Sequence, residues 1–421
     1  MPDVFAELEW RGFVQQATPE LAAHLRAERR AIYCGFDPTA PSLQLGNLMP
    51  LMLLKQLQLG GHRPIIVMGG GTGLIGDPSG KRNERPLLSR EQIRENLHRQ
   101  RDQMAHLLDF DDRHTGALVV NNADWLEQQS LVDFLRDIGK HFSVNIMMQK
   151  ESVQARLETG ISYTEFSYML LQAYDFLHLF SDRRYHSTVQ VGGSDQWGNI
   201  TAGIDLIRRV AGGEAHGLVA PLLTTSSGAK FGKTEGGAIW LDPALTSPYQ
   251  LYQYWINVDD RDVEKYLKLF SLQPRAEIEA LIASSRRDPS KREAQRALAA
   301  EITERIHGLE ATRAAISAAA SAFGEIAVST DLKGTLDVMR QSAPTTLVQI
   351  RPATVVDALV AAKLAQSKSE ARRLIQQGGV YLNTRRVEDV DEQVQADDWV
   401  DGSTLLLRRG KKNYALLRVE S

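Results

Sequence analysis

Short apolar runs alternate with longer stretches of helical period along the first half of the chain. These runs lack the clean polar–apolar alternation of strands that have one face in water. Both faces of the strands should therefore be covered by helices, as in a parallel, doubly wound α/β sheet. The predicted strands are residues 31–36, 64–70, 117–122, 187–193 and 218–224.

Strand patterns stop near residue 248, and helical period then continues to about residue 325. After a looser stretch, the last seventy or so residues return to a mixed pattern with two helices and three short strands. The chain is therefore predicted to form an α/β domain, a helical domain, a linker and a small α+β domain. Their predicted bounds are 1–225, 226–330, 331–352 and 353–421.

A glycine-rich or polar cluster follows each predicted strand of the first domain. The carboxyl ends of parallel strands meet at one edge of a sheet, and open α/β sheets bind ligands at that edge. Each cluster alone is also compatible with a simple tight turn, but five at one edge favour a binding crevice. The polar side chains expected there are Asp37, Asp77, Asn122, Asp195 and Lys230.

The predicted helix at 161–180 carries three polar residues among apolar ones. Tyr168, Gln172 and Asp175 are spaced by four and then three residues, so they share one face of the helix. A carboxylate and an acceptor amide in such a place suit an ammonium group or a hydroxyl. This spacing indicates a small-molecule pocket, and a purely structural hydrogen-bonded trio is the alternative.

Two lysines lie in a glycine-rich stretch after the last predicted strand. Lys230 and Lys233, with the hydroxyl of Thr234, suit a polyphosphate. A second basic pair, Lys81 and Arg85, follows another glycine-rich cluster. Neither stretch has the spacing of the common phosphate-binding loop or of the dinucleotide fingerprint. Exposed surface loops are therefore the alternative interpretation.

The composition is that of an ordinary globular protein, with 43% hydrophobic and 24% charged residues. Its 421 residues are too many for one core and predict two or three domains. The single cysteine, Cys34, excludes an internal disulfide and a cysteine-based metal cluster. No apolar run is long enough to span a bilayer. We therefore expect a cytoplasmic protein with no membrane contact and no protein-bound metal.

Six segments of the chain are long and specific: YCGFDPTAPSL, GLIGDPSGK, KHFSVNIMMQKESV, ISYTEFSYMLLQAYDF, GGSDQWGNITAG and KFGKTEGGAIWLD. Together they closely resemble the bacterial tyrosyl-tRNA synthetases, which are class I aminoacyl-tRNA synthetases, along essentially the whole chain. The resemblance implies a Rossmann-like catalytic domain that activates tyrosine with ATP and Mg²⁺. It also implies transfer of tyrosine to the 3′-terminal adenosine of tRNA(Tyr), an anticodon-side helical domain, and a homodimer with its interface near residues 140–149.

The resemblance assigns a tyrosine pocket to this chain. In the family, the phenolic hydroxyl is held by the residues that match Tyr33 and Asp175. The ammonium group is held by those that match Asp77, Tyr168 and Gln172. Three of these five side chains are the polar helix face described above. Two further amides are assigned to the pocket, namely Gln190 and, beside the reacting carboxylate, Gln196.

The resemblance also assigns an ATP site. The KFGKT segment is the second signature of the family, whose lysines stabilise the pyrophosphate as it leaves, and Lys81 and Arg85 assist. Residues that match Cys34, Gly192 and Asp195 approach the ribose. The ATP-binding residues are then Cys34, Gly35, Asp37, Gly46, Gly192, Asp195 and Lys233, and the catalytic residues are Lys230, Lys233, Thr234, Lys81, Arg85, Thr39, Gln44 and Asn47.

One signature departs from the family. Its first signature is normally His-x-Gly-His, and this chain has Gln44, Gly46 and Asn47 in the corresponding places. The amide nitrogens can still donate hydrogen bonds to phosphates at a helix start. They cannot become cationic, so the transition state should lose stabilisation on the order of 1–3 kcal/mol. We favour a working synthetase, and the alternative is a catalytically impaired homologue that only binds tyrosine or RNA.

The last domain resembles an RNA-binding fold shared with a small-subunit ribosomal protein. The net charge of −3 means that contact with RNA needs a local basic patch. Basic side chains of this domain suit a phosphate backbone, although a solvated helix is the alternative. The candidates are Lys368, Arg372 and Arg373 on a helix, and Arg385 and Arg386 after a strand.

Three rival functions make different demands on the sequence. A nicotinamide oxidoreductase needs a dinucleotide fingerprint after the first strand, where GFDPTAP stands instead. A pure RNA-binding protein has no need of Lys230 and Lys233. A tryptophan-specific relative has no need of the hydroxyl-reading pair Tyr33 and Asp175.

Overall fold

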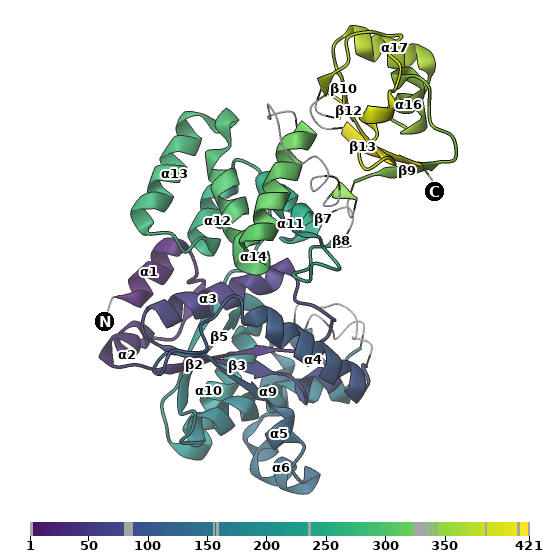
Figure 1. Ribbon diagram of the computed structural model, residues 1–421. Helices are drawn as coiled ribbons and strands as arrows, with labels where there is room; N and C mark the ends of the chain where they lie inside the picture. Colours follow the sequence, from purple (N-terminus) through teal and green to yellow (C-terminus); the bar gives the residue numbers. More distant parts are fainter. Residues whose placement is uncertain are drawn as a thin grey trace. The chain divides into compact units, whose positions relative to one another are not determined.

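The contacts of the computed structural model fall into two units (Figure 1). The first unit comprises Met1–Asp242 and Asp259–Arg287, and the second comprises Pro243–Val258 and Asp288–Ser421. The predicted helical domain is thus divided between the units, and its bounds stay a prediction. The structure describes residues 3–79, 87–154, 156, 160–234, 237–323, 336, 339–340, 343–383, 385–410 and 413–419.

A six-stranded sheet in the order β1-β6-β5-β2-β3-β4 forms the centre of the first unit (Figure 1). Neighbouring strands are parallel, except that β1 pairs antiparallel with β6 at the edge. The predicted parallel, doubly wound sheet is confirmed, but β1 is too short to leave a pattern in the sequence. The strands are β1 (Gln16–Ala17), β2 (Ala31–Phe36), β3 (Arg63–Met68), β4 (Leu118–Asn121), β5 (Ser187–Gly193) and β6 (His216–Ala220).

Strand β6 is displaced from its predicted bounds of 218–224. It begins at His216 and ends at Ala220, directly before Pro221. Proline has no N–H to donate to the ladder, so it ends the strand at this point. The residues after Pro221 are therefore free of the sheet and form part of a loop.

Helices cover both faces of this sheet. α3 packs on one face, and α9 and α10 pack on the other (Figure 1). Every residue of β6 is buried, as are Leu51 and Leu54 of α3. Because both faces of the sheet are covered, polar and apolar residues do not alternate along its strands. No helix in the described ranges is long and apolar enough to cross a membrane. The helices of this unit are α1 (Val4–Arg11), α2 (Leu21–Ala27), α3 (Leu48–Leu59), α4 (Arg90–Met104), α5 (Ala123–Leu126), α6 (Leu131–Asp137), α7 (Val144–Met148), α8 (Glu151–Gln154), α9 (Tyr163–Ser181), α10 (Trp197–Ala211), α12 (Val263–Phe270) and α13 (Arg275–Arg287).

The order of the strands places a switch of direction at β2. From β2 the chain passes outward through β3 and β4, and it later returns to β5 and β6 on the other side. β2 and β5 pair as far as Tyr33 and Gln190, yet each strand continues for three more residues. The two strands therefore separate at their carboxyl ends, where open α/β sheets bind ligands.

The second unit contains α11 (Pro248–Ile256), which packs on α14 (Glu293–Phe323), and a small α+β fold. α14 is interrupted at Gly308, whose φ of 83° is left-handed. The α+β fold confirms both predicted helices as α16 (Val355–Ala361) and α17 (Lys368–Gln376), which share a core with a five-stranded sheet. The sheet has the order β11-β10-β12-β13-β9, with strands β9 (Thr345–Val348), β10 (Val380–Leu382), β11 (Arg385–Arg386), β12 (Thr404–Arg409) and β13 (Asn413–Val419).

Part of the predicted linker is a strand. β9 lies within residues 331–352, which the sequence predicts as a linker, and it pairs in parallel with β13. Its four residues alternate only between exposed and half-buried positions. So short a segment becomes a strand through its neighbour β13, which lies much later in the chain. Residues 331–335, 337–338 and 341–342 of the predicted linker lie outside the described residues.

Candidate functional site

A cavity of about 490 Å³ opens where β2 and β5 separate. Its walls come from both strands, the turn after β2, α9, and residues 222–234 after β6, which we call the lysine loop. The structure thus brings together the polar side chains that the sequence places in one crevice. These are Asp37, Asp77, Asn122, Asp195 and Lys230, all of which line the cavity.

Asp175 is a buried carboxylate on α9 whose two oxygens are both hydrogen-bonded. Trp125 Nε1 donates to Oδ1 at 2.7 Å, and Asn122 Nδ2 donates to Oδ2 at 2.9 Å. Burial raises the pKa of Asp175 to about 7, although both hydrogen bonds act to lower it. Sequence reasoning missed Trp125, because α5 meets α9 only in the fold. The carboxylate is therefore held in one orientation, from which it can accept a hydrogen bond from a ligand hydroxyl.

Tyr33 and Gln190 are partners in the last residue pair between β2 and β5, and both line the cavity. Each side chain is only 1% exposed. Within the described part of the chain, neither Tyr33 Oη nor Gln190 Oε1 has a hydrogen-bond partner. Burial, followed by the charge of Asp175, raises the pKa of Tyr33 well above its usual value, so its hydroxyl stays protonated. Buried polar atoms without partners are costly, and a polar ligand would satisfy them.

A chain of hydrogen bonds connects this subsite to the turn after β2. Tyr168 Oη donates to Asp37 Oδ2 at 2.9 Å, and Thr72 Oγ1 donates to Asp37 Oδ1 at 2.7 Å. Asn122 Nδ2 donates to Thr72 Oγ1 at 2.8 Å and also to Asp175. Asp37 is thus physically linked to the side chains around Asp175. Thr72 is a further residue that sequence reasoning missed.

A second network lies around Asp77, which is buried. Gln196 Nε2 donates to Asp77 Oδ2 at 2.7 Å, and the Ser79 N–H donates to Oδ1 at 2.9 Å. Asn199 Nδ2 donates to Gln172 Oε1 at 3.0 Å and to Gln196 Oε1 at 3.2 Å. Carboxylate and amide oxygens therefore gather on this wall, which suits a cationic group of a ligand. The sequence did not single out Asn199, whose role is visible only through its neighbours.

The two amides of the departing signature lie in the short turn that leads into α3. The Gln44 N–H donates to Asn47 Oδ1 at 2.8 Å, so the Asn47 amide nitrogen remains as the donor of that side chain. Both residues line the cavity, as does Gly46. A Cβ atom on Gly46 would meet nothing within 4 Å, so the cavity reaches the bare backbone there. Amide donors and open backbone at the start of α3 form a suitable cradle for an anion.

The lysine loop packs against this turn. Gly232 has a φ of 75°, and a Cβ atom there would lie 3.1 Å from Leu45 Cβ and 3.3 Å from the Gly46 nitrogen. Lys230 and Lys233 are exposed and line the cavity, and neither forms an ion pair with any described residue. The two signatures therefore form one polar wall, with two positive charges that pair with no carboxylate among the described residues.

The other residues predicted on the ATP side differ in whether they line the cavity. Thr234 is exposed, does not line the cavity and donates from Oγ1 to the Gly237 carbonyl at 3.4 Å. Lys81 and Arg85 lie outside the described residues. Five further candidates line the cavity, namely Cys34, Gly35, Thr39, Gly192 and Asp195.

The five predicted RNA-binding cations all lie exposed in the second unit, but they differ in their contacts. Lys368 forms an ion pair with Asp357 at 2.7 Å. Arg385 forms ion pairs with Glu392 and, at 3.0 Å, with Asp398. Arg372 and Arg373 of α17 form no ion pair in the described part of the chain. The Arg386 guanidinium lies over Gly378, where a Cβ atom would collide with it.

Replacement of Asp175 by Asn tests the buried carboxylate. A carboxyl group whose pKa is about 7 in the folded state and about 4 in the unfolded state destabilises the fold increasingly as pH rises between those values. The free energy of unfolding, measured by urea denaturation without ligands, should therefore fall more between pH 5 and pH 8 in the wild type than in Asp175→Asn. Asp133→Asn, at an exposed position on α6, should follow the wild type. An identical pH dependence in the wild type and Asp175→Asn would contradict the raised pKa.

The chain resembles known proteins along its whole length. A family model described as tRNA synthetases class I (W and Y) matches residues 26–324, and one described as the Tyrosine--tRNA ligase SYY-like C-terminal domain matches residues 336–417. The chain is 49% identical over 425 residues to the Tyrosine--tRNA ligase of Roseiflexus castenholzii, covering 100% of both, and 46% identical over 425 residues to Tyrosine--tRNA ligase 1 of Bacillus subtilis, covering 99% of both. A C-terminally truncated mitochondrial tyrosyl-tRNA synthetase of Aspergillus nidulans has a similar structure, with a TM-score of 0.68 and 31% identity over 75% of this chain and 92% of that one. The chain therefore belongs to the class I tRNA synthetase family of the tryptophan and tyrosine enzymes.

Proposed function

We propose that the protein is a tyrosine–tRNA ligase, which uses ATP to join L-tyrosine to tRNA(Tyr). Relatives that match the full length of the chain bear that name. One structural observation supports the choice of amino acid. The Tyr33 phenol, which has no hydrogen-bond partner among the described residues, and the oriented carboxylate of Asp175 line the same cavity. A cytoplasmic location, expected from the sequence, is part of this proposal.

The polar subsite suits the phenolic hydroxyl of tyrosine. That hydroxyl can donate to Asp175 and accept from Tyr33, which satisfies the buried phenol. Phenylalanine would fill the same space but leave Tyr33 and Asp175 without a ligand partner, at a cost of about 1–3 kcal/mol for each buried group. Selection of tyrosine over phenylalanine therefore follows from polar atoms that the protein buries in advance.

The opposite end of the amino acid meets the acidic wall. Its ammonium group can be held by Asp77, by the Gln172 amide oxygen and by the Tyr168 hydroxyl. The bonds of Gln196 and Asn199 hold Asp77 and Gln172 in place before the ligand arrives. With both ends held, the amino-acid carboxylate should point towards the two signatures, where Gln196 lies beside it.

The first chemical step needs positioning and charge stabilisation. An oxygen of the tyrosine carboxylate attacks the α-phosphorus of ATP, and the bond to the bridging oxygen of the β-phosphate breaks. Tyrosyl-AMP and pyrophosphate form, and no protein base is needed because the carboxylate is already ionised at neutral pH. In the second step a hydroxyl of the terminal adenosine of tRNA(Tyr) attacks the tyrosyl carbonyl, and AMP leaves. Catalysis of the first step then depends on alignment and on stabilising the leaving charge.

The wall formed by the two signatures supplies that stabilisation. Gln44 and Asn47 can donate to the ATP phosphates at the start of α3, and Gly46 allows the nucleotide to approach the backbone. Lys230 and Lys233 carry positive charges that are not committed to a carboxylate of the described chain, and Mg²⁺ enters with ATP as part of the substrate. These charges act most strongly on the negative charge that develops as pyrophosphate leaves. Lys81, Arg85 and Thr234 keep their proposed supporting roles.

A homodimer is the assembly that the exposed apolar side chains support. Leu131 and Val132 on α6 are 73% and 71% exposed, and Val144 and Ile146 on α7 are 61% and 51% exposed. α7 lies within residues 140–149, which the sequence predicts at the interface, and α6 ends just before them. Exposed apolar groups on neighbouring elements mark an interaction surface, and we propose a second copy of this chain as its partner.

Tyrosine-dependent exchange of pyrophosphate into ATP tests the proposed function. The purified protein should catalyse exchange with tyrosine, and its melting temperature should rise with tyrosine but not with phenylalanine or tryptophan. A melting shift without any exchange would instead support the catalytically impaired homologue. Exchange that depends on tryptophan would contradict the assignment of the tyrosine pocket.

Restoring histidine at both signature positions tests the role of the amides. The double variant Gln44→His, Asn47→His should raise the maximal exchange rate about tenfold or more, since a donor that can carry charge stabilises the transition state more than the bound substrate. The KM for ATP should change less than the rate. Gln128→His, at an exposed position after α5, is the control and should leave the rate unchanged. A double variant that alters only the KM for ATP would contradict this account.

The α17 arginines, which form no ion pair with any described residue, test the RNA surface. Arg372→Ala with Arg373→Ala should weaken binding of tRNA(Tyr) severalfold and flatten its dependence on salt, because phosphate contacts release counterions. Arg385→Ala is the matched control, since that guanidinium already pairs with Asp398 and Glu392. Filter binding at several salt concentrations measures both effects. A larger loss in the control than in the double variant would contradict the assignment.

Light scattering on a sizing column tests the dimer. The chain has a mass of 46.9 kDa, and the wild type should elute with twice that mass. The double variant Val144→Asp, Ile146→Asp should be a monomer, because two charges would lie in the proposed apolar interface. Leu59→Asp, at a similarly exposed site on α3, should remain a dimer. A monomeric wild type would contradict the proposed assembly.

A further inference from the structure

The lysine loop is attached to α12 and the residue before it, which come from a distant part of the sequence. Both belong to the first unit. The loop has two attachment points, one polar and one aromatic, and they lie on either side of Lys230 in the sequence. The positions of Lys230 and Lys233 therefore depend on these two attachments.

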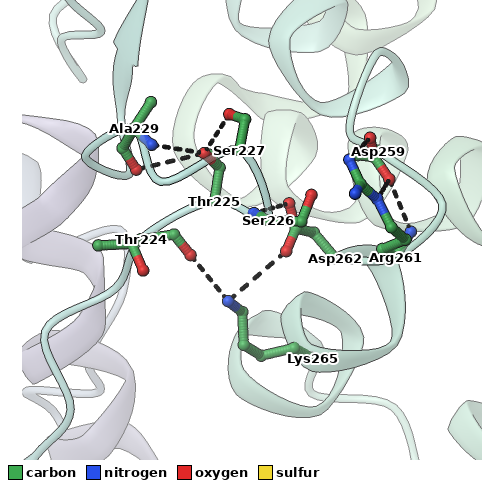
Figure 2. Close-up of polar contacts among 9 residues, drawn as sticks. All are labelled: Thr224, Thr225, Ser226, Ser227, Ala229, Asp259, Arg261, Asp262 and Lys265. Atoms are coloured by element: carbon green, nitrogen blue, oxygen red, sulfur yellow. Dashed lines mark hydrogen bonds and ion pairs between the residues drawn. The ribbon is translucent and has the colours of Figure 1, made fainter.

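The polar attachment involves Asp262 and Lys265 (Figure 2). Asp262 Oδ2 accepts a hydrogen bond from the Ser226 N–H at 2.9 Å, and Lys265 Nζ donates to the Thr224 carbonyl at 2.9 Å. Asp262 and Lys265 also form an ion pair at 3.7 Å. Asp262 is only 4% exposed, so its carboxylate depends on these partners. Two side chains of one helix end thus bind two backbone groups of the loop.

The geometry of Asp262 shows that this attachment replaces a local one. Asp262 occupies the N-cap position of α12, where an aspartate usually accepts an N–H from its own helix. Here it makes no such capping bond, and its carboxylate accepts from Ser226 instead. The helix therefore forgoes a local interaction in favour of a contact with the lysine loop.

The loop segment between the attachment and Lys230 is itself ordered by hydrogen bonds (Figure 2). The Thr225 N–H donates to the Ala229 carbonyl at 2.8 Å, and the Ala229 N–H donates to Thr225 Oγ1 at 3.1 Å. Gly228, with a φ of 83°, allows the tight turn between them. Thr224 and Lys230 form an isolated β-bridge at the base of this turn. If Thr224 moved relative to α12, Lys230 would therefore move with it.

The aromatic attachment involves Phe231, which directly follows Lys230. Its ring lies 5.1 Å from the ring of Tyr266 and 5.2 Å from that of Phe270, measured between centroids, and it is stacked on Phe270. All three side chains are buried. Aromatic pairs at such distances are favourable beyond their buried area. Phe231 thus secures the chain between Lys230 and Lys233 against α12.

We infer that Asp262 and Lys265 are positioning residues for the step that forms pyrophosphate. Neither residue lines the cavity, and both act by fixing the backbone that carries Lys230 and Lys233. A misplacement of about 1 Å can cost roughly a hundredfold in rate when catalysis depends on alignment. The inference rests on the proposed function, because it assumes that the two lysines stabilise the leaving pyrophosphate.

Kinetic variants test the inference in the full-length protein. Lys265→Met and Asp262→Asn should each lower the maximal rate of tyrosine-dependent pyrophosphate exchange at least about tenfold, while the KM for tyrosine stays within about twofold. Lys265→Arg should recover much of the rate, since its guanidinium can still donate to the Thr224 carbonyl. Arg261→Met is the matched control: it removes one positive charge from the adjacent turn, where Arg261 pairs with Asp259 at 2.9 Å, and should leave the rate unchanged (Figure 2).

The outcomes separate this inference from the proposed function. If the wild type catalyses no exchange, the proposed function fails. If the wild type exchanges and Lys265→Met and Asp262→Asn keep its maximal rate, the positioning role is overturned and the function stands. A variant that loses both its rate and its tyrosine-induced melting shift would point to general unfolding, which also overturns the inference. Loss of rate with a normal melting shift, together with recovery in Lys265→Arg, supports it.

Discussion

The separation of β2 from β5 beyond Tyr33 and Gln190 is the constraint on which the site depends. A sheet whose strands stayed paired to their ends would leave no room between Gly35 and Gly192, and main-chain hydrogen bonds would occupy the backbone there. Because the pairing stops early, the cavity extends between the strand ends, and the first polar side chains beyond the sheet come to line it. The hydrogen bonds from Asp175 through Asn122 and Thr72 to Asp37 then hold one wall of the opening in a single arrangement.

The two walls of the cavity carry opposite charge, and we propose that this arrangement orients the substrates. Acidic groups, among them Asp77, gather around the place proposed for the amino acid, whereas Lys230 and Lys233 face the place proposed for the phosphates. The reacting carboxylate and the α-phosphate should meet between the walls. Since Gln44 and Asn47 are neutral, we propose that positive charge on this side comes chiefly from the lysine loop and from the Mg²⁺ expected with ATP. The position of the lysine loop, and hence its attachment to α12, should therefore matter more here than in an enzyme with histidines at those two places.

The sequence predicts the architecture and the polar face of α9. It does not predict the contacts between distant elements that hold the site residues in place. Apolar runs without alternation indicate a sheet covered on both sides, and the spacing of Tyr168, Gln172 and Asp175 indicates one helix face. Both patterns are local and periodic, so they can be recognised without knowledge of the fold. Trp125 and Asn199 were not predicted as site residues because they have partners on other elements. β9 was not predicted because it becomes a strand only beside β13. The attachment of Asp262 to Ser226 is of the same kind, since an aspartate before a helix normally indicates a cap.

A crystal structure of the protein with a non-hydrolysable analogue of tyrosyl-AMP would show whether the cavity holds tyrosine as proposed. The phenol oxygen of the analogue should lie within hydrogen-bond distance of Tyr33 and Asp175. The linkage that replaces the phosphate should lie between the 44–47 turn and the lysine loop. An analogue bound with its phenol away from Asp175, or with its adenosine outside the opening between β2 and β5, would contradict the account.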